Sequence, residues 1–207
     1  VMSIVSYNNR SISSITAIPG AAKSLTHIKT LTASSDSTLS FVNGSSDVVL
    51  DSTYPIYIFK FINIHPGTDN THITFNFSID SGSNYNVTKT STLFRSYHDE
   101  ADSATALEYR TDMDLAQSTG FQKLNSPLES DNDSSGSGYL YLFNPSSTTF
   151  VKHFISNCQS MSNLAYSIQD FVAGYGNTTS AVDAIQFKMS SGNVDAGTIK
   201  LYGLKDS

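Results

Sequence analysis

The sequence predicts an all-β protein: an antiparallel β-sandwich, jelly-roll-like, with about nine or ten strands. Apolar and polar residues alternate with period two along most of the 207-residue chain, which is the pattern of half-buried strands. Clusters of Gly, Asn, Asp and Ser, which favour turns, separate the alternating runs. Ser and Thr together make up more than a quarter of the chain, and they disfavour helices because their side chains compete for backbone hydrogen bonds.

The chain is expected to divide into a polar N-terminal arm, residues 1–23, and a single sandwich domain, residues 24–207. The arm is weakly patterned, and no linker long enough to separate two further domains follows it. A polar arm is ordered only when something holds it, so we expect it to anchor the domain to a partner surface. The anchoring residues would be the apolar side chains of the arm, namely Ile4, Val5, Tyr7 and Ile12.

The expected strands follow from the alternation. The clearest run is 73–79, which places Ile73, Phe75, Phe77 and Ile79 on one face. Most Phe residues fall on such inward faces, where burial of each stabilises the fold by roughly 1.5 to 3 kcal/mol. The strands expected in chain order are 24–31, 37–42, 54–64, 73–79, 138–143, 184–189 and 197–204.

The run 54–64 differs from the others because it is apolar on both faces. Such a strand is either covered on both sides or central in a sheet whose outer face meets a partner. One face is expected to hold Ile56, Ile58, Ile62 and Ile64, and the other Tyr57, Phe59 and Phe61.

One segment, 102–117, has two interpretations. Loosely spaced apolar residues, with Asp102 as an N-cap, fit a short helix. The Thr, Tyr and Asp content of the segment fits a loop equally well.

Composition excludes several function classes. The 18 acidic and 12 basic residues give a net charge of −6, and the chain has no basic cluster, which argues against nucleic acid and anionic membrane surfaces. The single Cys158 excludes an intrachain disulfide and a cysteine-based zinc site. The densest apolar run, 54–64, is too short to span a bilayer, and we expect neither membrane insertion nor a secretion signal.

No pattern in the sequence points to catalysis. The five His residues are single, and none lies in a known catalytic motif, so we expect a non-enzymatic protein without a cofactor. The most polar segment, 95–102, has three carboxylates beside one His. It is interpreted first as a solvated loop, then as a ligand-contacting loop, and least readily as an acid–base site. The candidate ligand-contacting residues are Tyr97, His98, Asp99 and Tyr109.

Residues 131–136 match only the first half of a calcium-binding loop. Position twelve of that loop would be Leu142, where a bidentate Glu is required. We therefore expect a polar hairpin there and no metal site.

Several segments, taken in order, resemble one family. They are MSIVSYNNRSIS (2–13), LTHIKTLTAS (25–34), YIFKFINIHP (57–66), LFNPSSTTFVKHF (142–154), IQFKMSSGN (185–193) and GTIKLYG (197–203). These stretches resemble small virion structural proteins of marine tailed phages, including cyanophages, which are described as structural or tail-fibre-like. The resemblance covers nearly the whole chain and brings no catalytic residues with it.

The resemblance implies a structural component of a bacteriophage virion, displayed on the tail or the capsid. The loops 95–114 and 131–138 would then contact the host surface or neighbouring virion proteins. The expected partners are other virion proteins, further copies of the chain, most plausibly as a trimer, and a host surface polysaccharide or receptor.

Two other functions remain open. One is a carbohydrate-binding, lectin-like module, recognisable by exposed Tyr residues beside Asp and Asn. The tyrosines expected in loops or at strand ends, which suit contact with sugars or proteins and equally fit the rim of the sandwich, are Tyr97, Tyr109, Tyr139, Tyr166 and Tyr175. The other is a glycosidase, which needs two carboxylates that flank a cleft.

Overall fold

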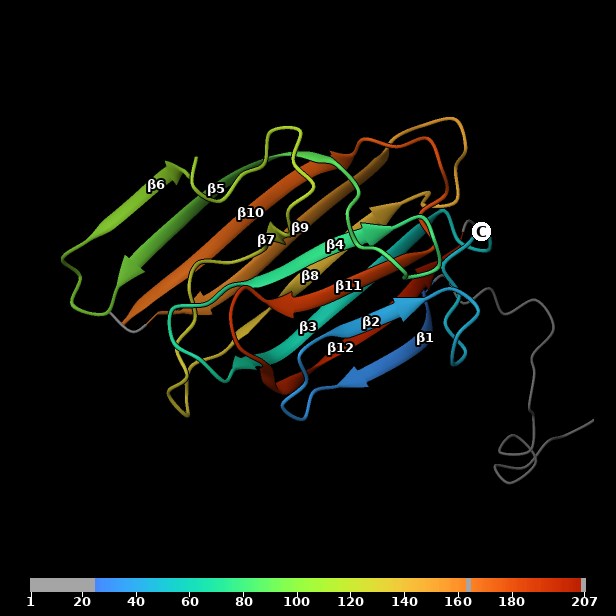
Figure 1. Cartoon of the computed structure of the whole chain (residues 1–207). Helices are drawn as coiled ribbons and strands as arrows, with labels where there is room; N and C mark the ends of the chain where they lie inside the picture. Colours follow the sequence, from blue (N-terminus) through green and yellow to red (C-terminus); the bar gives the residue numbers. More distant parts are fainter. Residues whose placement is uncertain (1–24, 163–164, 206–207) are drawn as a thin grey trace, which may run out of the picture.

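The computed structural model describes residues 25–162 and 165–205, which form twelve β-strands in two antiparallel sheets (Figure 1). The predicted arm, with Ile4, Val5, Tyr7 and Ile12, lies outside the described residues. Within the described ranges there is no helix, and hence none that could cross a membrane. The strands are β1 (Leu25–Thr32), β2 (Leu39–Val42), β3 (Ile56–Pro66), β4 (Ile73–Ser78), β5 (Lys89–Asp99), β6 (Thr105–Tyr109), β7 (Gln122–Lys123), β8 (Gly136–Phe143), β9 (Lys152–Met161), β10 (Tyr166–Gly176), β11 (Ala184–Met189) and β12 (Val194–Leu204).

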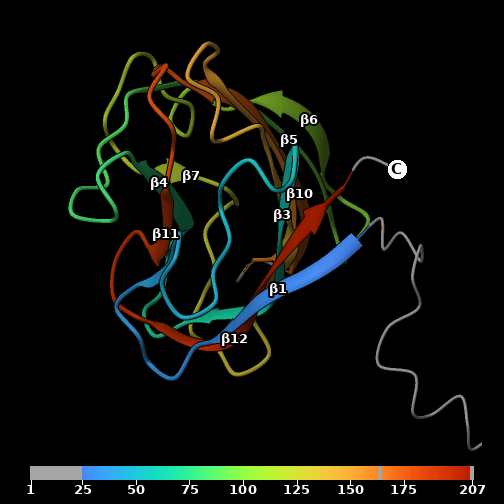
Figure 2. The same ribbon diagram turned by 90° about the vertical axis from the view of Figure 1, so that its right-hand side faces the viewer.

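The two sheets differ in width. The larger has the strand order β1-β12-β3-β8-β9-β10-β5-β6, and the smaller has the order β2-β11-β4-β7. Between the described strands, the chain passes from one sheet to the other at eight connections, and only the β5–β6, β8–β9 and β9–β10 connections stay within one sheet. The two layers are also visible after a quarter turn (Figure 2). The predicted all-β antiparallel sandwich is confirmed.

The core lies between the sheets and is rich in Phe. Phe187 on β11 is at its centre, because its ring contacts four others. The ring centroids of Phe59 and Phe61 on β3 lie 5.3 Å away, and those of Phe41 and Phe75 lie 6.2 and 6.3 Å away. All five side chains are at most 2% exposed. The inward Phe residues predicted from alternation therefore form one cluster of edge-to-face and tilted rings.

A β-bulge changes the predicted faces of β3. Asn63 has a φ of 49°, and the pairing of β3 with β8 shifts register between Phe61 and Ile64. The bulge moves Ile64 into the core with Phe61, whereas Ile62 stays 40% exposed. The expectation that Ile64 shares a face with Ile62 was wrong, because an extra residue reverses the alternation beyond it.

The sequence allowed either a short helix or a loop for the segment 102–117. The structure shows no helix there, and only part of the segment is a loop. A turn follows β5, in which the Asp99 carboxylate accepts hydrogen bonds from the backbone N–H groups of Ser103 and Ala104 at 2.8 and 2.9 Å. The chain then returns as β6 along β5, with Tyr109 opposite Phe94. This hairpin and the two-residue β7 bring the strands to twelve, where about nine or ten were expected.

The larger sheet extends beyond the smaller one at its β6 edge (Figure 1). The connection between β6 and β8 packs on the inner face of the extension. Its residues Asn125 and Ser126 are fully buried, and the Ser126 backbone N–H donates to the Asp170 carboxylate on β10 at 2.6 Å. The connection thus covers the part of the larger sheet that the smaller sheet does not reach. A pocket lies beside this connection.

Candidate functional site

The pocket has a volume of about 500 Å³ and lies on the inner face of the extension. Two neighbouring strands form its floor, and three connections form its walls. Its lining is Arg95 and Tyr97 from β5, Tyr166 and Ile168 from β10, Pro127 and Glu129 from the β7–β8 connection, Asn70 from the β3–β4 connection, and Ser162 from the β9–β10 connection.

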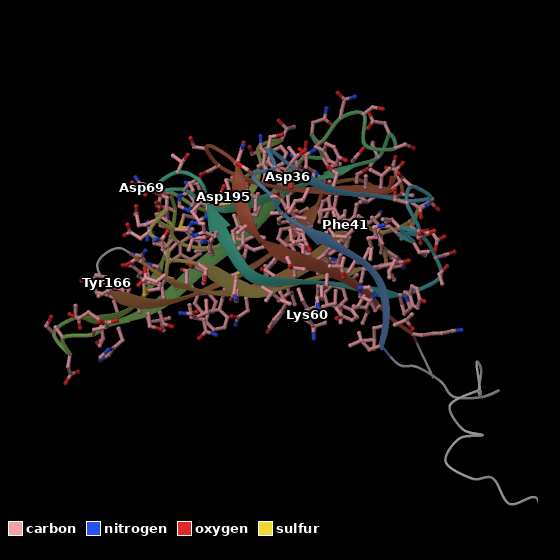
Figure 3. The ribbon with its side chains drawn as sticks, turned by 90° about the horizontal axis from the view of Figure 1, so that it is seen from below. Asp36, Phe41, Lys60, Asp69, Tyr166 and Asp195 are labelled. Carbon is pink, nitrogen blue, oxygen red and sulfur yellow. The ribbon has the colours of Figure 1, made fainter. Side chains whose placement is uncertain are left out.

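Hydrogen bonds join two of the walls. Ser130 donates to the Asp69 carboxylate through its backbone N–H, at 2.8 Å, and through its hydroxyl, at 2.5 Å. The Asn70 backbone N–H donates to the Glu129 carboxylate at 3.2 Å. Figure 3 shows Asp69 and Tyr166 at the same end of the molecule. Residues far apart in the sequence are therefore held around one opening.

Two tyrosine rings form a corner of the pocket. The centroids of Tyr97 and Tyr166 are 5.3 Å apart, and their planes make an angle of 83°. Ile168 pairs directly with Tyr97 across the two strands, so an aliphatic side chain continues this surface. The corner provides apolar ring faces beside hydroxyl groups, a combination suited to ligands that are themselves partly polar.

The Arg95 side chain is held in place by several partners. Its Nε donates to Glu108 at 2.6 Å and its Nη1 donates to the Ser126 hydroxyl at 3.2 Å. The guanidinium carbon also lies 5.3 Å from the Tyr97 ring centroid. Ser126 in turn donates to Asp170, whose pKa burial raises to about 6 against the lowering effect of the Ser126 hydrogen bonds. The cation is thus pre-positioned by the protein before any ligand arrives.

Glu129 is the acidic side chain of the pocket. It is only 8% exposed, and its Oε2 accepts the hydrogen bond from Asn70. No ion pair to Glu129 occurs in the described part of the chain. A carboxylate offers about four acceptor positions, so it retains capacity for a donor from a ligand.

The structure separates the candidate ligand-contacting residues of the sequence. Tyr97 lines the pocket. His98 is the next residue on the strand and therefore faces the other side, where its Nε2 lies 3.1 Å from Asp102. Asp99 is taken up by the turn before β6, and the exposed Tyr109 donates its hydroxyl hydrogen to Asp114 at 2.5 Å.

Sequence reasoning singled out Tyr97 and Tyr166 as tyrosines suited to contact surfaces, but it did not bring them together, and it missed Glu129 and Asn70. These four residues lie in four different segments, and alternation along one strand carries no information about which connections meet above it. The two tyrosines and the polar character of 95–102 were the local signals near the site.

The Asp131 segment is a turn that leads into β8. The Ser134 backbone N–H donates to the Asp131 carbonyl at 2.9 Å, and Asp131 and Asp133 are exposed. Among residues 25–162 and 165–205, no group of three or more His, Cys, Asp or Glu side chains is placed to hold a metal ion.

A second surface feature lies on the outer face of the larger sheet. Phe94 and Phe171 stack there, with centroids 4.8 Å apart and planes 10° from parallel. Ile155 is 49% exposed and Tyr139 38% exposed on the neighbouring strands. Figure 3 shows Lys60 pointing outward from this sheet, whereas Phe41 lies among the side chains between the sheets. The aromatic and aliphatic residues of this outer face include Phe94, Tyr139, Tyr141, Ile155 and Phe171.

Comparison with known proteins gave no match of any kind: no family model, no curated protein and no solved structure matches the chain. The geometry and the resemblance described above are therefore the grounds for a functional proposal.

Proposed function

We propose that the protein is a non-enzymatic structural component of a bacteriophage virion, displayed on the tail or the capsid. The observation on which this rests is the outer face of the larger sheet, where Phe94, 42% exposed, stacks on Phe171 and Ile155 is 49% exposed. Contiguous exposed apolar surface of this kind marks an interaction site in soluble proteins. The resemblance of the sequence to small virion proteins supports the same role.

The strand order supports a jelly-roll architecture. Four consecutive strands of the larger sheet, in the order β1-β12-β3-β8, correspond one by one to the order β2-β11-β4-β7 of the smaller sheet. Within each corresponding pair, the chain crosses from one sheet to the other. Jelly rolls consist of two such sheets of four strands and are common in viral capsid proteins and lectins. In this proposal β9, β10, β5 and β6 are an addition at the β8 edge.

Self-association is the role proposed for the outer face. Closed symmetric assemblies are the commonest oligomers, and a trimer suits both a fibre and a capsid position. Other virion proteins, or a host surface polysaccharide or receptor, would contact the remaining loops. The arm, residues 1–23, would anchor the domain.

The virion role is tested by gold labelling of intact particles of the phage that encodes the chain, with antibody against the purified protein. Label on the head or the tail is the expected result and distinguishes a capsid position from a fibre. Particles that bear no label, while the same antibody detects the purified protein, would overturn the proposal.

Self-association is tested separately by light scattering during size-exclusion chromatography. The expected mass is three times the 22.4 kDa of one chain. Phe94→Ser on the outer face should reduce it to that of one chain, whereas Phe150→Ser, at a 69% exposed position in the β8–β9 connection, should leave it unchanged. A wild-type protein that elutes as a single chain at every concentration would remove the assembly role of this face.

A further inference from the structure

We infer that the pocket between β5, β10 and the β7–β8 connection binds a neutral saccharide. The carbohydrate-binding alternative predicted from the sequence thereby gains a specific site. The inference does not depend on the virion role, because it rests on the pocket alone and not on the outer face.

The size of the pocket suits a small polar ligand. Its volume of about 500 Å³ lies within the range of small-molecule sites, and it has room for about two sugar rings. Its floor is a pair of hydrogen-bonded strands, in which Ile168 is paired with Tyr97. A site on paired strands is held more rigidly than one built only from loops.

The tyrosine corner suits the two kinds of surface that a sugar ring presents. A pyranose has flat patches of C–H groups, which pack on aromatic faces, and a rim of hydroxyl groups. Tyr97 and Tyr166 stand at 83° to each other, so a ring stacked on one of them meets the edge of the other. The tyrosine hydroxyl groups provide polar contacts at the same place.

The charges in the pocket favour a neutral ligand. Arg95 and Glu129 both line it, so the lining holds one cation and one anion, and the Arg95 charge is partly offset by its ion pair with Glu108 at 2.6 Å. A cationic ligand would be attracted by Glu129 and repelled by Arg95. An anionic ligand would be attracted by Arg95 and repelled by Glu129. A neutral polyol avoids both repulsions, because its hydroxyl groups donate to the carboxylate and accept from the guanidinium.

Both charged groups are fixed before binding, which lowers the entropic cost of ordering them around a ligand. Glu108 and Ser126 hold Arg95, while the Asn70 backbone N–H holds Glu129. Glu129 is also nearly buried, so its hydrogen bond to a ligand hydroxyl would be shielded from water.

The experiment is calorimetric titration of the full chain with sugars that share a ring and differ in charge. The neutral probes are the methyl glycosides of glucose, galactose and mannose, with maltose, cellobiose and lactose as disaccharides. The charged probes are glucuronic acid and glucosamine. We expect at least one neutral probe to bind at millimolar concentration or below, and glucuronic acid and glucosamine to bind at least about tenfold more weakly than it does. The inference is overturned if no neutral probe binds, or if a charged probe binds more tightly.

Variants locate the binding. Tyr166→Ala should weaken the Kd for the neutral probe at least about tenfold, whereas Tyr166→Phe, which keeps the ring, should stay within about twofold of the wild type. Glu129→Gln removes the charge but keeps the shape, and it should weaken binding several-fold. Phe150→Ala removes an exposed ring in the β8–β9 connection, outside the pocket, so it is the control and should bind as the wild type does.

Two results at this stage would overturn the inference. One is binding unchanged in both Tyr166→Ala and Glu129→Gln. The other is binding lost in Phe150→Ala. Circular dichroism establishes that each variant is folded, and Glu129→Gln keeps the test decisive if Tyr166→Ala fails to fold.

Discussion

Lys89 on β5 donates a hydrogen bond through its Nζ to the side-chain oxygen of Asn76 on β4, so that a lysine joins the two sheets inside the core. Both residues are fully buried. The Nζ also donates to the Val87 carbonyl at 2.9 Å, and no ion pair to Lys89 occurs among the described residues. Burial of the ammonium without a counter-charge lowers its pKa to about 7.

The buried lysine predicts that stability rises with pH in the alkaline range. The pKa of Lys89 is about 7 in the folded state against an ordinary value of 10.5, so between these two values the unfolded chain binds more protons than the folded one. The free energy of unfolding should therefore rise with pH across this window, by at most about 1.4 kcal/mol per pH unit, and the penalty should be constant below it.

Urea titrations at several pH values within this window measure the effect. Lys89→Met has no charge at this position, and its stability should depend less steeply on pH than that of the wild type. Identical slopes for the two proteins would contradict the assignment of the low pKa to Lys89.

Phe187 should be the most sensitive aromatic position of the core, because its ring lies against four other rings. Phe187→Ala removes these contacts and leaves a cavity, so it should cost about 3 to 5 kcal/mol in the free energy of unfolding. Phe150→Ala deletes the same ring at an exposed position and should change stability by less than about 0.5 kcal/mol. Thermal and urea unfolding measure both variants, and equal losses would mean that the core is not centred on Phe187.

At Gly138, the backbones of β8 and β9 lie so close together that no side chain fits between them. A Cβ at this position would lie 2.3 Å from the Asn157 carbonyl oxygen and 2.7 Å from the Cys158 Cα on β9. Gly138→Ala should therefore push the two strands apart and lower the melting temperature by several degrees. Gly67→Ala is the control, since its nearest atoms lie at an ordinary 3.7 Å. Equal melting temperatures for the two variants would contradict this account.

The sequence was informative where apolar and polar residues alternate along a strand. The runs 73–79 and 184–189 were predicted, and they became the adjacent strands β4 and β11 of the smaller sheet. Ile79 was expected on the inward face with Phe77, but it lies beyond the end of β4 and is 43% exposed. The burial of the polar residues between the inward Phe residues could not be predicted from the alternation. Thr74 and Asn76 are buried, because the Asn76 amide donates to the carbonyls of Tyr85 and Thr119 in connections that cover the strand. Burial under a loop leaves no periodic signal.

The pocket and the bulge had no signature in the sequence for different reasons. The bulge at Asn63 inserts one residue into an apolar run, and both registers of that run look equally hydrophobic. The pocket depends on the unequal widths of the sheets, which bring Tyr97 and Tyr166 under the connection that holds Glu129. Only long-range strand pairing determines that arrangement.

Cys158 should report unfolding, because its thiol is inaccessible in the folded protein. The side chain is fully buried on the inner face of β9, and burial raises its pKa to about 12, so the reactive thiolate is scarce as well as shielded. A disulfide reagent should therefore leave the native protein unmodified and should label one thiol per chain in urea, which absorbance of the released thiolate measures.

The Gly138→Ala variant connects this prediction to the strand contact. A Cβ at position 138 would lie 2.8 Å from the Cys158 Sγ, so the variant must displace the thiol or open the β8–β9 pair. Its Cys158 should react measurably faster than that of the wild type under native conditions, whereas Gly67→Ala should react at the wild-type rate. Labelling of the native wild type at the rate of free cysteine would show that the thiol is not enclosed. It would also contradict the claim that close packing against Cys158 requires a glycine at position 138.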